Sequence, residues 1–195
     1  MAVLIYLEHW EGKFKKLSFE LVSYASKIAE MIGSQSIALT IGTVDEQELE
    51  KLALHGADKV IHIENQKLDT LDEQAFTNLV SDVARNYNAT VLVLSNNNSG
   101  KALAPRLSVQ LKAGLVSGVS KLPVSISPFV VYKKVYSGKA YVNMRIKTDI
   151  KILTLAQNSF EIIQDPKPFV VENLNIKSND KMLNIKVREV DEMKG

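Results

Sequence analysis

Four short apolar runs, each followed by a segment with helical spacing, constrain the fold of this chain more than any other feature. The runs are Ala2–Glu8, Ser36–Gly42, Lys59–Glu64 and Ala89–Ser95. Continuous apolar runs of this length are typical of strands that are covered on both faces. The helical segments are Leu17–Gly33, Asp45–Ala57, Leu71–Asn88 and Ala104–Gly114. Four strand–helix units in succession predict an α/β fold in which a parallel sheet lies between two layers of helices.

Glycine and proline predict where three of these helices begin or end. Gly33 and Gly56 follow the first and second helical segments, where glycine is a common carboxyl-terminal cap. Pro105 is best tolerated in the first turn of a helix, so we expect the fourth helix to begin near Ala102 or Leu103.

The pattern changes after Gly114, because the following apolar segments have no helices between them. These segments are Leu115–Leu122, Phe129–Gly138, Lys139–Lys147 and Ile150–Gln157. A turn signal at Tyr136–Lys139 joins two of them, so they predict antiparallel hairpin additions at one edge of the sheet. We expect the last segment to return to the sheet as a buried strand.

The residues after Gln157 are mostly polar until a strand-like alternation at Met182–Glu192. This segment has little core of its own. We therefore expect an α/β domain over residues 1–157, followed by a linker or tail over residues 158–195.

Composition excludes several classes of function. The chain has 24 Lys and Arg against 22 Asp and Glu, a net charge of +2, which gives no reason to expect nucleic-acid binding. It has no cysteine, so disulfides and thiolate sites are excluded. No apolar run approaches the roughly 18 residues of a membrane span, and the first residues do not resemble a signal peptide. We expect a cytoplasmic protein.

The loop after the fourth apolar run, Ser95–Lys101, raises the question of a phosphate site. A Walker A loop fails, because Ser95 stands at its first glycine and Ala102 at its magnesium-binding hydroxyl. A glycine loop before a helix can still bind an anion through free N–H groups. The candidate residues for such a weak anion site are Ser99, Gly100, Lys101 and Arg106. The alternative is a polar loop with no ligand, and no other cofactor-binding residue is apparent.

No catalytic or metal site is predicted. The three histidines, His9, His55 and His62, have no partner at a metal-binding spacing, and no Gly-x-Ser-x-Gly nucleophile motif is present. Five lysines between Lys133 and Lys151 indicate either a solvated sheet face or a docking surface.

Several segments together resemble the amino-terminal domain of the electron-transfer flavoprotein alpha subunit. They are VLIYLEH, HGADKVIHIE, LVLSNNNSGKALAPRLSVQLKAGLVSGVSKL and VYSGKAYVNMRI, and they span Val3–Ala156 in the family's order. Three residues depart from the family pattern. Lys101 and Ala102 replace the usual Arg-Asp, and Gly118 replaces an Asp, so an acid–base pair that orders the loop is altered.

The resemblance implies a Rossmann-like three-layer fold of the adenine nucleotide alpha hydrolase-like type. It also implies a platform domain in a FAD-dependent electron carrier that has no substrate turnover of its own. FAD would be bound mainly by a carboxyl-terminal domain absent from this sequence, with none expected in this chain alone. The partners would be the beta subunit, in a heterodimer, and dehydrogenases and a quinone reductase or other acceptor through the whole complex.

Two further expectations follow. Phe129–Ile146 should lie at or beside the beta-subunit contact, with Val131 and Val135 as contact residues. The alternative function, from a different class, is a stand-alone adenine-nucleotide-binding module of the universal-stress or ATP-pyrophosphatase type.

Overall fold

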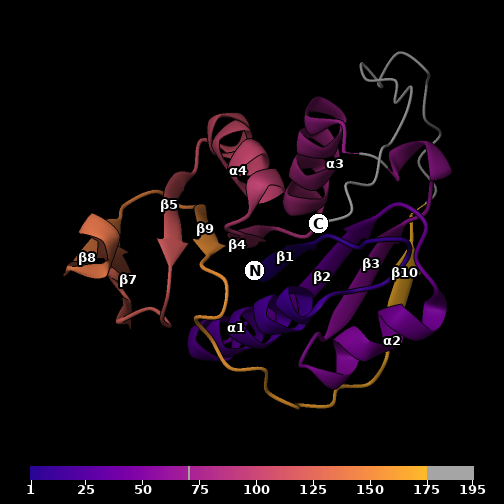
Figure 1. Ribbon diagram of the computed structural model, residues 1–195, viewed down its shortest axis with the longest axis horizontal. Helices are drawn as coiled ribbons and strands as arrows, with labels where there is room; N and C mark the ends of the chain where they lie inside the picture. Colours follow the sequence, from indigo (N-terminus) through magenta and orange to yellow (C-terminus); the bar gives the residue numbers. More distant parts are fainter. Residues whose placement is uncertain (70, 175–195) are drawn as a thin grey trace, which may run out of the picture.

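The fold is built around one mixed sheet, shown in a computed structural model that describes residues 1–69 and 71–174 (Figure 1). Within these residues the strand order is β10-β3-β2-β1-β4-β9-β5-β7-β6, and β8 pairs with β7. The strands of the parallel part are β1 Ala2–Leu7, β2 Gln35–Ile41, β3 Lys59–Ile63, β4 Ala89–Ser95, β5 Gly114–Val119, β9 Lys151–Leu155 and β10 Val171–Asn173. The antiparallel additions are β6 Ser125–Ile126, β7 Phe129–Val135 and β8 Ala140–Ile146.

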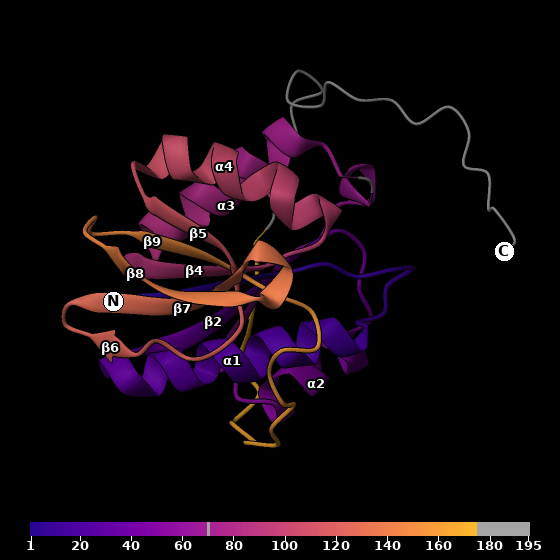
Figure 2. The same ribbon diagram turned by 60° about the vertical axis from the view of Figure 1, so that its left-hand side comes forward.

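Helices cover both faces of the parallel strands. The helices are α1 Lys16–Ile32, α2 Glu46–Leu54, α3 Glu73–Asn86 and α4 Asn98–Leu111, with short 3-10 turns at Gln66–Leu68 and Tyr136–Gly138. Figure 2 shows α1 and α2 on one face and α3 and α4 on the other. The predicted three-layer α/β fold is therefore confirmed.

Strand β1 shows why the apolar runs are continuous. Val3, Ile5 and Leu7 belong to the core cluster that includes α1, whereas Leu4 and Tyr6 belong to the cluster that includes α3 and α4. All six residues of β1 are buried. Side chains alternate between the two faces, and both faces are covered, so every position requires an apolar residue.

The predicted ends of the first two helices are also confirmed. Gly33 follows α1 in the left-handed conformation, and its N–H donates to the Glu30 carbonyl. Gly56 follows the last turn of α2 with φ 107°, and a Cβ added there would lie 2.6 Å from Ser26 Oγ. Glycine at position 56 thus allows the end of α2 to approach α1 closely.

The predicted start of the fourth helix is wrong. Helix α4 begins at Asn98 instead of Ala102 or Leu103, so Pro105 lies inside the helix. The reason is the N-cap, because Asn97 Oδ1 accepts a hydrogen bond from the Gly100 N–H at 2.9 Å. An asparagine cap five or six residues before the expected start fixes the helix more strongly than the preference of proline for a first turn.

The segment after Gly114 forms the expected antiparallel edge. Strands β7 and β8 pair along their whole length, from Phe129↔Ile146 to Val135↔Ala140. Strand β9 returns between β4 and β5 as a parallel strand, as expected for the last segment. Val131, expected at a subunit contact, instead lies fully buried in the core cluster of α1. Its position on the inner face of β7 excludes it as a surface contact.

Residues 158–174, here called the strap, run back from β9 along α1 and α2 to the other end of the sheet (Figure 1). The buried carboxylate of Glu20, on α1, accepts the N–H groups of Asn158, Ser159 and Phe160 at 3.1, 2.8 and 2.9 Å. Ser23, one turn later, forms reciprocal hydrogen bonds with the backbone of Ile163. Helix α1 thus holds the first part of the strap.

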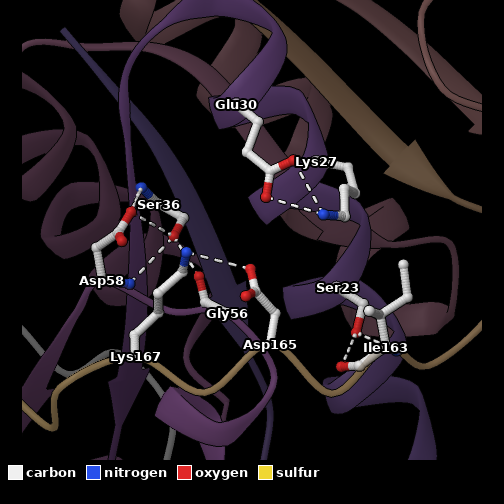
Figure 3. A network of polar contacts seen from close by, with 9 residues as sticks. All are labelled: Ser23, Lys27, Glu30, Ser36, Gly56, Asp58, Ile163, Asp165 and Lys167. Carbon is white, nitrogen blue, oxygen red and sulfur yellow. Dashed lines mark hydrogen bonds and ion pairs between the residues drawn. The ribbon is translucent and has the colours of Figure 1, made fainter.

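The second part of the strap is held by α2 and β3. Figure 3 shows Asp165 and Lys167 of the strap beside Gly56, with a 3.2 Å ion pair between their side chains. Their backbone N–H groups donate to the carbonyls of Leu54 and Ala53. The strap ends in β10, which pairs with β3 in parallel. The predicted strand Met182–Glu192 lies outside the described residues, and the division of the chain at residue 157 stays a prediction.

Candidate functional site

The site with the most polar contacts lies at the carboxyl edge of the sheet, where β1 and β4 end side by side. Strand β4 ends at Ser95, and α4 starts three residues later under the Asn97 cap. A Cβ added to Gly100 would lie 1.7 Å from the Ser95 carbonyl oxygen. Only glycine fits at this position, so the first turn of α4 packs directly against the end of β4.

The carboxylate of Glu8 lies against this loop. Asn97 Nδ2 donates to Glu8 Oε1 at 3.0 Å and to Oε2 at 3.2 Å. Ser95 Oγ lies 2.9 Å from Glu8 Oε1 and 2.6 Å from Asn97 Oδ1, and its single proton serves one of the two acceptors at a time. The first turn of a helix attracts negative charge. A side-chain carboxylate therefore lies beside the capped start of α4, where its negative charge disfavours a ligand phosphate.

The four residues expected at an anion site do not converge on one point. The Gly100 N–H is taken by Asn97, and Arg106 Nη2 donates to Glu73 Oε2 of α3 at 2.6 Å. Lys101 is exposed, and Ser99 lines a cavity beside the residues that follow β1. An anion site at these residues stays a prediction, and the geometry around Glu8 opposes it.

Gly118, one of the three positions that depart from the family pattern, is held by a neutral hydrogen-bond network. Thr154 Oγ1 of β9 donates to Asn96 Oδ1 at 2.8 Å and accepts the Gly118 N–H at 3.0 Å. The Asn96 N–H donates to the Leu155 carbonyl. These contacts fix the loop after β4 to β5 and β9 without an acid–base pair.

Two cavities flank the loop that follows β1. The smaller one has a volume of about 410 Å³ and is lined by Lys15, Lys16 and Ser18 at the start of α1, among others. The larger one has a volume of about 700 Å³ and is lined mainly by residues after β1, after β2 and before α3. Both include Glu8 and Trp10, and Trp10 is 59% exposed.

The larger cavity has an acidic wall. Glu8, Glu11, Asp45 and Asp69 contribute carboxylates to its lining. Burial, and secondly the charge of Glu8, raise the pKa of Tyr6, which also lines this cavity. The Tyr6 phenol therefore stays protonated at neutral pH. Carboxylates facing one cavity repel phosphate groups, so this cavity is unfavourable for a nucleotide.

His9 holds the loop between the two cavities. Its Nε2 lies 3.0 Å from the Ile41 carbonyl, and its Nδ1 accepts the Gly12 N–H at 3.3 Å. This pattern assigns the proton of a neutral imidazole to Nε2. His62, on β3, similarly bonds the Gly42 carbonyl at 2.8 Å. Both histidines therefore have structural contacts.

Two features are absent from the described residues, 1–69 and 71–174. No group of three or more His, Cys, Asp or Glu side chains there could hold a metal ion. In the same part of the chain, no helix has the length and apolar character needed to cross a membrane.

Sequence reasoning did not identify Glu8 as the centre of this site. The available signal was topological, because residues that follow two adjacent parallel strands meet at one edge of the sheet. Glu8 follows β1. Ser95 ends β4 and Asn97 follows it, 87 and 89 residues further along the chain than Glu8. The order of the strands, which places β1 beside β4, was needed to bring them together.

Comparison with known proteins gives the family. The model of the electron transfer flavoprotein domain matches residues 3–191. The chain is 28% identical over 128 residues to the acryloyl-CoA reductase electron transfer subunit beta of Anaerotignum propionicum, covering 66% of this chain and 35% of that protein. It is 27% identical over 160 residues to the electron transfer flavoprotein subunit alpha of Bacillus subtilis, covering 82% of this chain and 48% of that protein.

A third relative also has the name of an alpha subunit. The electron transfer flavoprotein subunit alpha of Megasphaera elsdenii is 30% identical over 123 residues, covering 63% of this chain and 36% of that protein. The chain thus spans between about a third and a half of the length of these relatives. The family match extends over nearly the whole chain, and this protein belongs to the electron transfer flavoprotein domain family, with the fold of an alpha-type amino-terminal domain.

Proposed function

We propose that this chain is the amino-terminal platform domain of an electron-transfer flavoprotein alpha subunit. The intact protein would carry electrons, through FAD, from dehydrogenases to a quinone reductase or another acceptor in the cytoplasm. The chain itself would turn over no substrate. The observation that carries the proposal is the family match over residues 3–191, together with relatives named as alpha subunits.

The geometry around Glu8 supports a platform role over cofactor binding by this chain. The side chain of Asn97 caps the first turn of α4, which is the phosphate-binding position of a nucleotide-binding α/β fold, and the carboxylate of Glu8 lies against this cap. In this proposal FAD binds mainly to a further domain of the intact protein. The same geometry disfavours the alternative of a stand-alone adenine-nucleotide-binding module.

The beta subunit is the proposed partner, and the β7–β8 hairpin is the proposed contact. Five consecutive residues of β8, Tyr141–Arg145, are exposed. Among them Tyr141 is 57%, Val142 37% and Met144 39% exposed. An edge strand with exposed apolar side chains is suited to a dedicated partner, which would cover the unpaired backbone groups as well.

One mixing experiment tests the proposal. The chain is purified alone and together with the beta subunit from the same organism, and both samples are examined by size-exclusion chromatography with absorbance detection at flavin wavelengths. We expect a stable complex with the beta subunit and no flavin bound to the chain alone. Failure to form the complex would contradict the platform role. Titration of the chain alone with AMP separates the alternative, which requires micromolar binding.

A further inference from the structure

Charge is distributed unevenly along this chain. Residues 121–151 carry seven Lys and Arg but one acidic residue, Asp149. The remaining residues carry 17 Lys and Arg against 21 Asp and Glu, so they are net negative. The hairpin end of the sheet is therefore a local basic region in a molecule whose total charge is only +2. A concentrated charge of this kind acts on the encounter with a partner of opposite sign.

The outer face of the β7–β8 hairpin combines this charge with aromatic side chains. Because side chains alternate along a strand, one face carries every second residue of each strand. The register pairs Val130 with Arg145, Tyr132 with Asn143, and Lys134 with Tyr141. We call these six residues the tyrosine face. None of the six is buried, and Tyr141, Asn143, Arg145 and Lys134 are exposed.

The centre of the tyrosine face is an ordered pair of rings. Tyr132 and Tyr141 stack with their centroids 5.1 Å apart and an interplanar angle of 25°. Lys121 Nζ lies 4.8 Å from the centroid of the Tyr132 ring. The loss of solvation at the Tyr132 hydroxyl raises its pKa, and the neighbouring Tyr141 raises it further. The hydroxyl therefore stays a neutral hydrogen-bond donor. Stacked tyrosines surrounded by cations resemble the centre and rim of a protein interface.

The opposite face of the hairpin has a different composition. Phe129, Val131 and Ile146 are buried in the core, and Val142 and Met144 continue the same face towards the tip. The inner face thus completes the domain and also carries Lys133 opposite Val142, whereas the outer face carries Lys134, Arg145 and the stacked rings.

We propose that the tyrosine face receives an acidic surface of the partner subunit, with the Tyr132–Tyr141 stack as its apolar anchor and Lys134 and Arg145 as its charged rim. This inference rests on the proposed function, because it specifies the chemistry of the beta-subunit surface. The rim charges accelerate association, and the tyrosine stack contributes to the lifetime of the complex.

The test is a charge reversal with a matched control. The variant K134E/R145E changes the charge of the tyrosine face by four units. The control K16E/K101E makes the same total change at the start of α1 and on α4, at two other exposed lysines. Binding of the beta subunit is measured by surface plasmon resonance at low and at physiological salt. We expect K134E/R145E to bind about tenfold or more weakly, mainly through slower association, and the control to change affinity less than about threefold.

A second variant separates the anchor from the rim. Tyr141→Ser removes one ring of the stack without changing charge. We expect faster dissociation at every salt concentration, whereas the salt dependence of association stays that of the unmodified chain.

Each remaining outcome decides between explanations. If the unmodified chain does not bind the beta subunit, the proposed function fails and this inference fails with it. If the unmodified chain binds and K134E/R145E binds equally well, only this inference is overturned. If K134E/R145E binds the beta subunit normally but self-associates, Lys134 and Arg145 serve to prevent edge-to-edge pairing of the sheet, and this inference is overturned. A single-stranded polynucleotide that binds as tightly as the beta subunit, and is lost in K134E/R145E, would overturn the assignment to an acidic protein surface.

Discussion

The two ends of the sheet are finished in opposite ways. At the β10 end the chain covers its own edge, because the strap crosses α1 and α2 and adds β10 to β3. At the β8 end five consecutive residues of the outer strand are exposed, and no further strand pairs with β8 within residues 1–69 and 71–174. The sheet therefore ends on one side in a three-residue strand that the strap attaches to β3, and on the other side in a seven-residue strand with exposed side chains (Figure 1).

This difference indicates which end of the sheet is suited to contact with a second subunit. The closed end, at β10, uses hydrogen bonds and an ion pair between segments up to 140 residues apart in sequence. The open end, at β8, combines exposed Tyr141, Val142 and Met144 with cations. An open edge without a partner is an aggregation hazard. A platform domain that is normally bound to a second subunit accounts for such an edge.

The largest predicted effect separates a buried position on strand β7 from an exposed position on strand β8 at the open end. Val131 and Met144 lie directly opposite each other on β7 and β8, yet Val131 is fully buried and Met144 is 39% exposed. We expect Val131→Lys to destabilise the fold by about 4 kcal/mol or more, because it buries an unpaired cation. Met144→Lys should cost less than about 1 kcal/mol. Urea denaturation of both variants measures the difference, and equal costs would contradict the burial of Val131 and the exposure of Met144 on this shared face.

A smaller effect is predicted at the closed end. Glu20→Ala removes the carboxylate that accepts three N–H groups of the strap, and we expect a loss of about 2 kcal/mol of unfolding free energy. Hydrogen exchange of the Asn158–Phe160 amides should also accelerate. Glu30→Ala, on the same helix, removes an exposed ion pair with Lys27 and should cost less than about 0.5 kcal/mol. If the two variants lose the same stability, Glu20 does not anchor the strap.

The smallest effect concerns pH and the attachment of β10. Lys59, and secondly the Tyr87 hydroxyl, lower the pKa of Glu172 on β10. A carboxyl whose pKa is lower in the folded state than in the unfolded state stabilises the fold at pH values above its unfolded-state pKa, which is about 4.3 for Glu. This stabilisation is lost as the pH falls through the folded-state pKa. Because the Glu172 side chain is 38% exposed, we expect less than about 1 kcal/mol.

The matching variant for this prediction is Glu172→Gln, which retains the size of the side chain and cannot titrate. Stability is measured by thermal unfolding of both proteins between pH 7 and pH 3. The unmodified chain should lose more stability on acidification than Glu172→Gln does. Parallel pH curves would show that Glu172 contributes nothing to the attachment of β10.

The sequence predicted the parts of the fold that depend on local pattern. Four apolar runs with alternating helices gave the parallel sheet, and the Tyr136–Lys139 turn gave the hairpin, because neighbouring residues determine these features. The start of α4 was missed because the pattern weighs Pro105 but not the Asn97 cap. Val131 was misplaced because alternation along β7 does not show which face meets the core.

The strap and the site around Glu8 could not be predicted, for a different physical reason. Both depend on contacts between segments about 90 to 140 residues apart, such as Glu8 with Asn97 and Glu20 with Phe160. Residues 158–170 form no helix or strand, so their sequence has no periodic pattern. Their backbone N–H groups bond instead to carbonyls of α2 and to a carboxylate of α1. Only the arrangement of the strands shows these partners.

The central claim is that the open end, and not the closed end, is the docking edge of this domain. Hydrogen–deuterium exchange of the chain, with and without the beta subunit, tests it most directly. The account predicts increased protection of the β8 amides, Ala140–Ile146, on binding, and no change at β10 and β3. Protection confined to β10 and β3, or a complex that leaves the β8 amides exchanging as in the free chain, would contradict it.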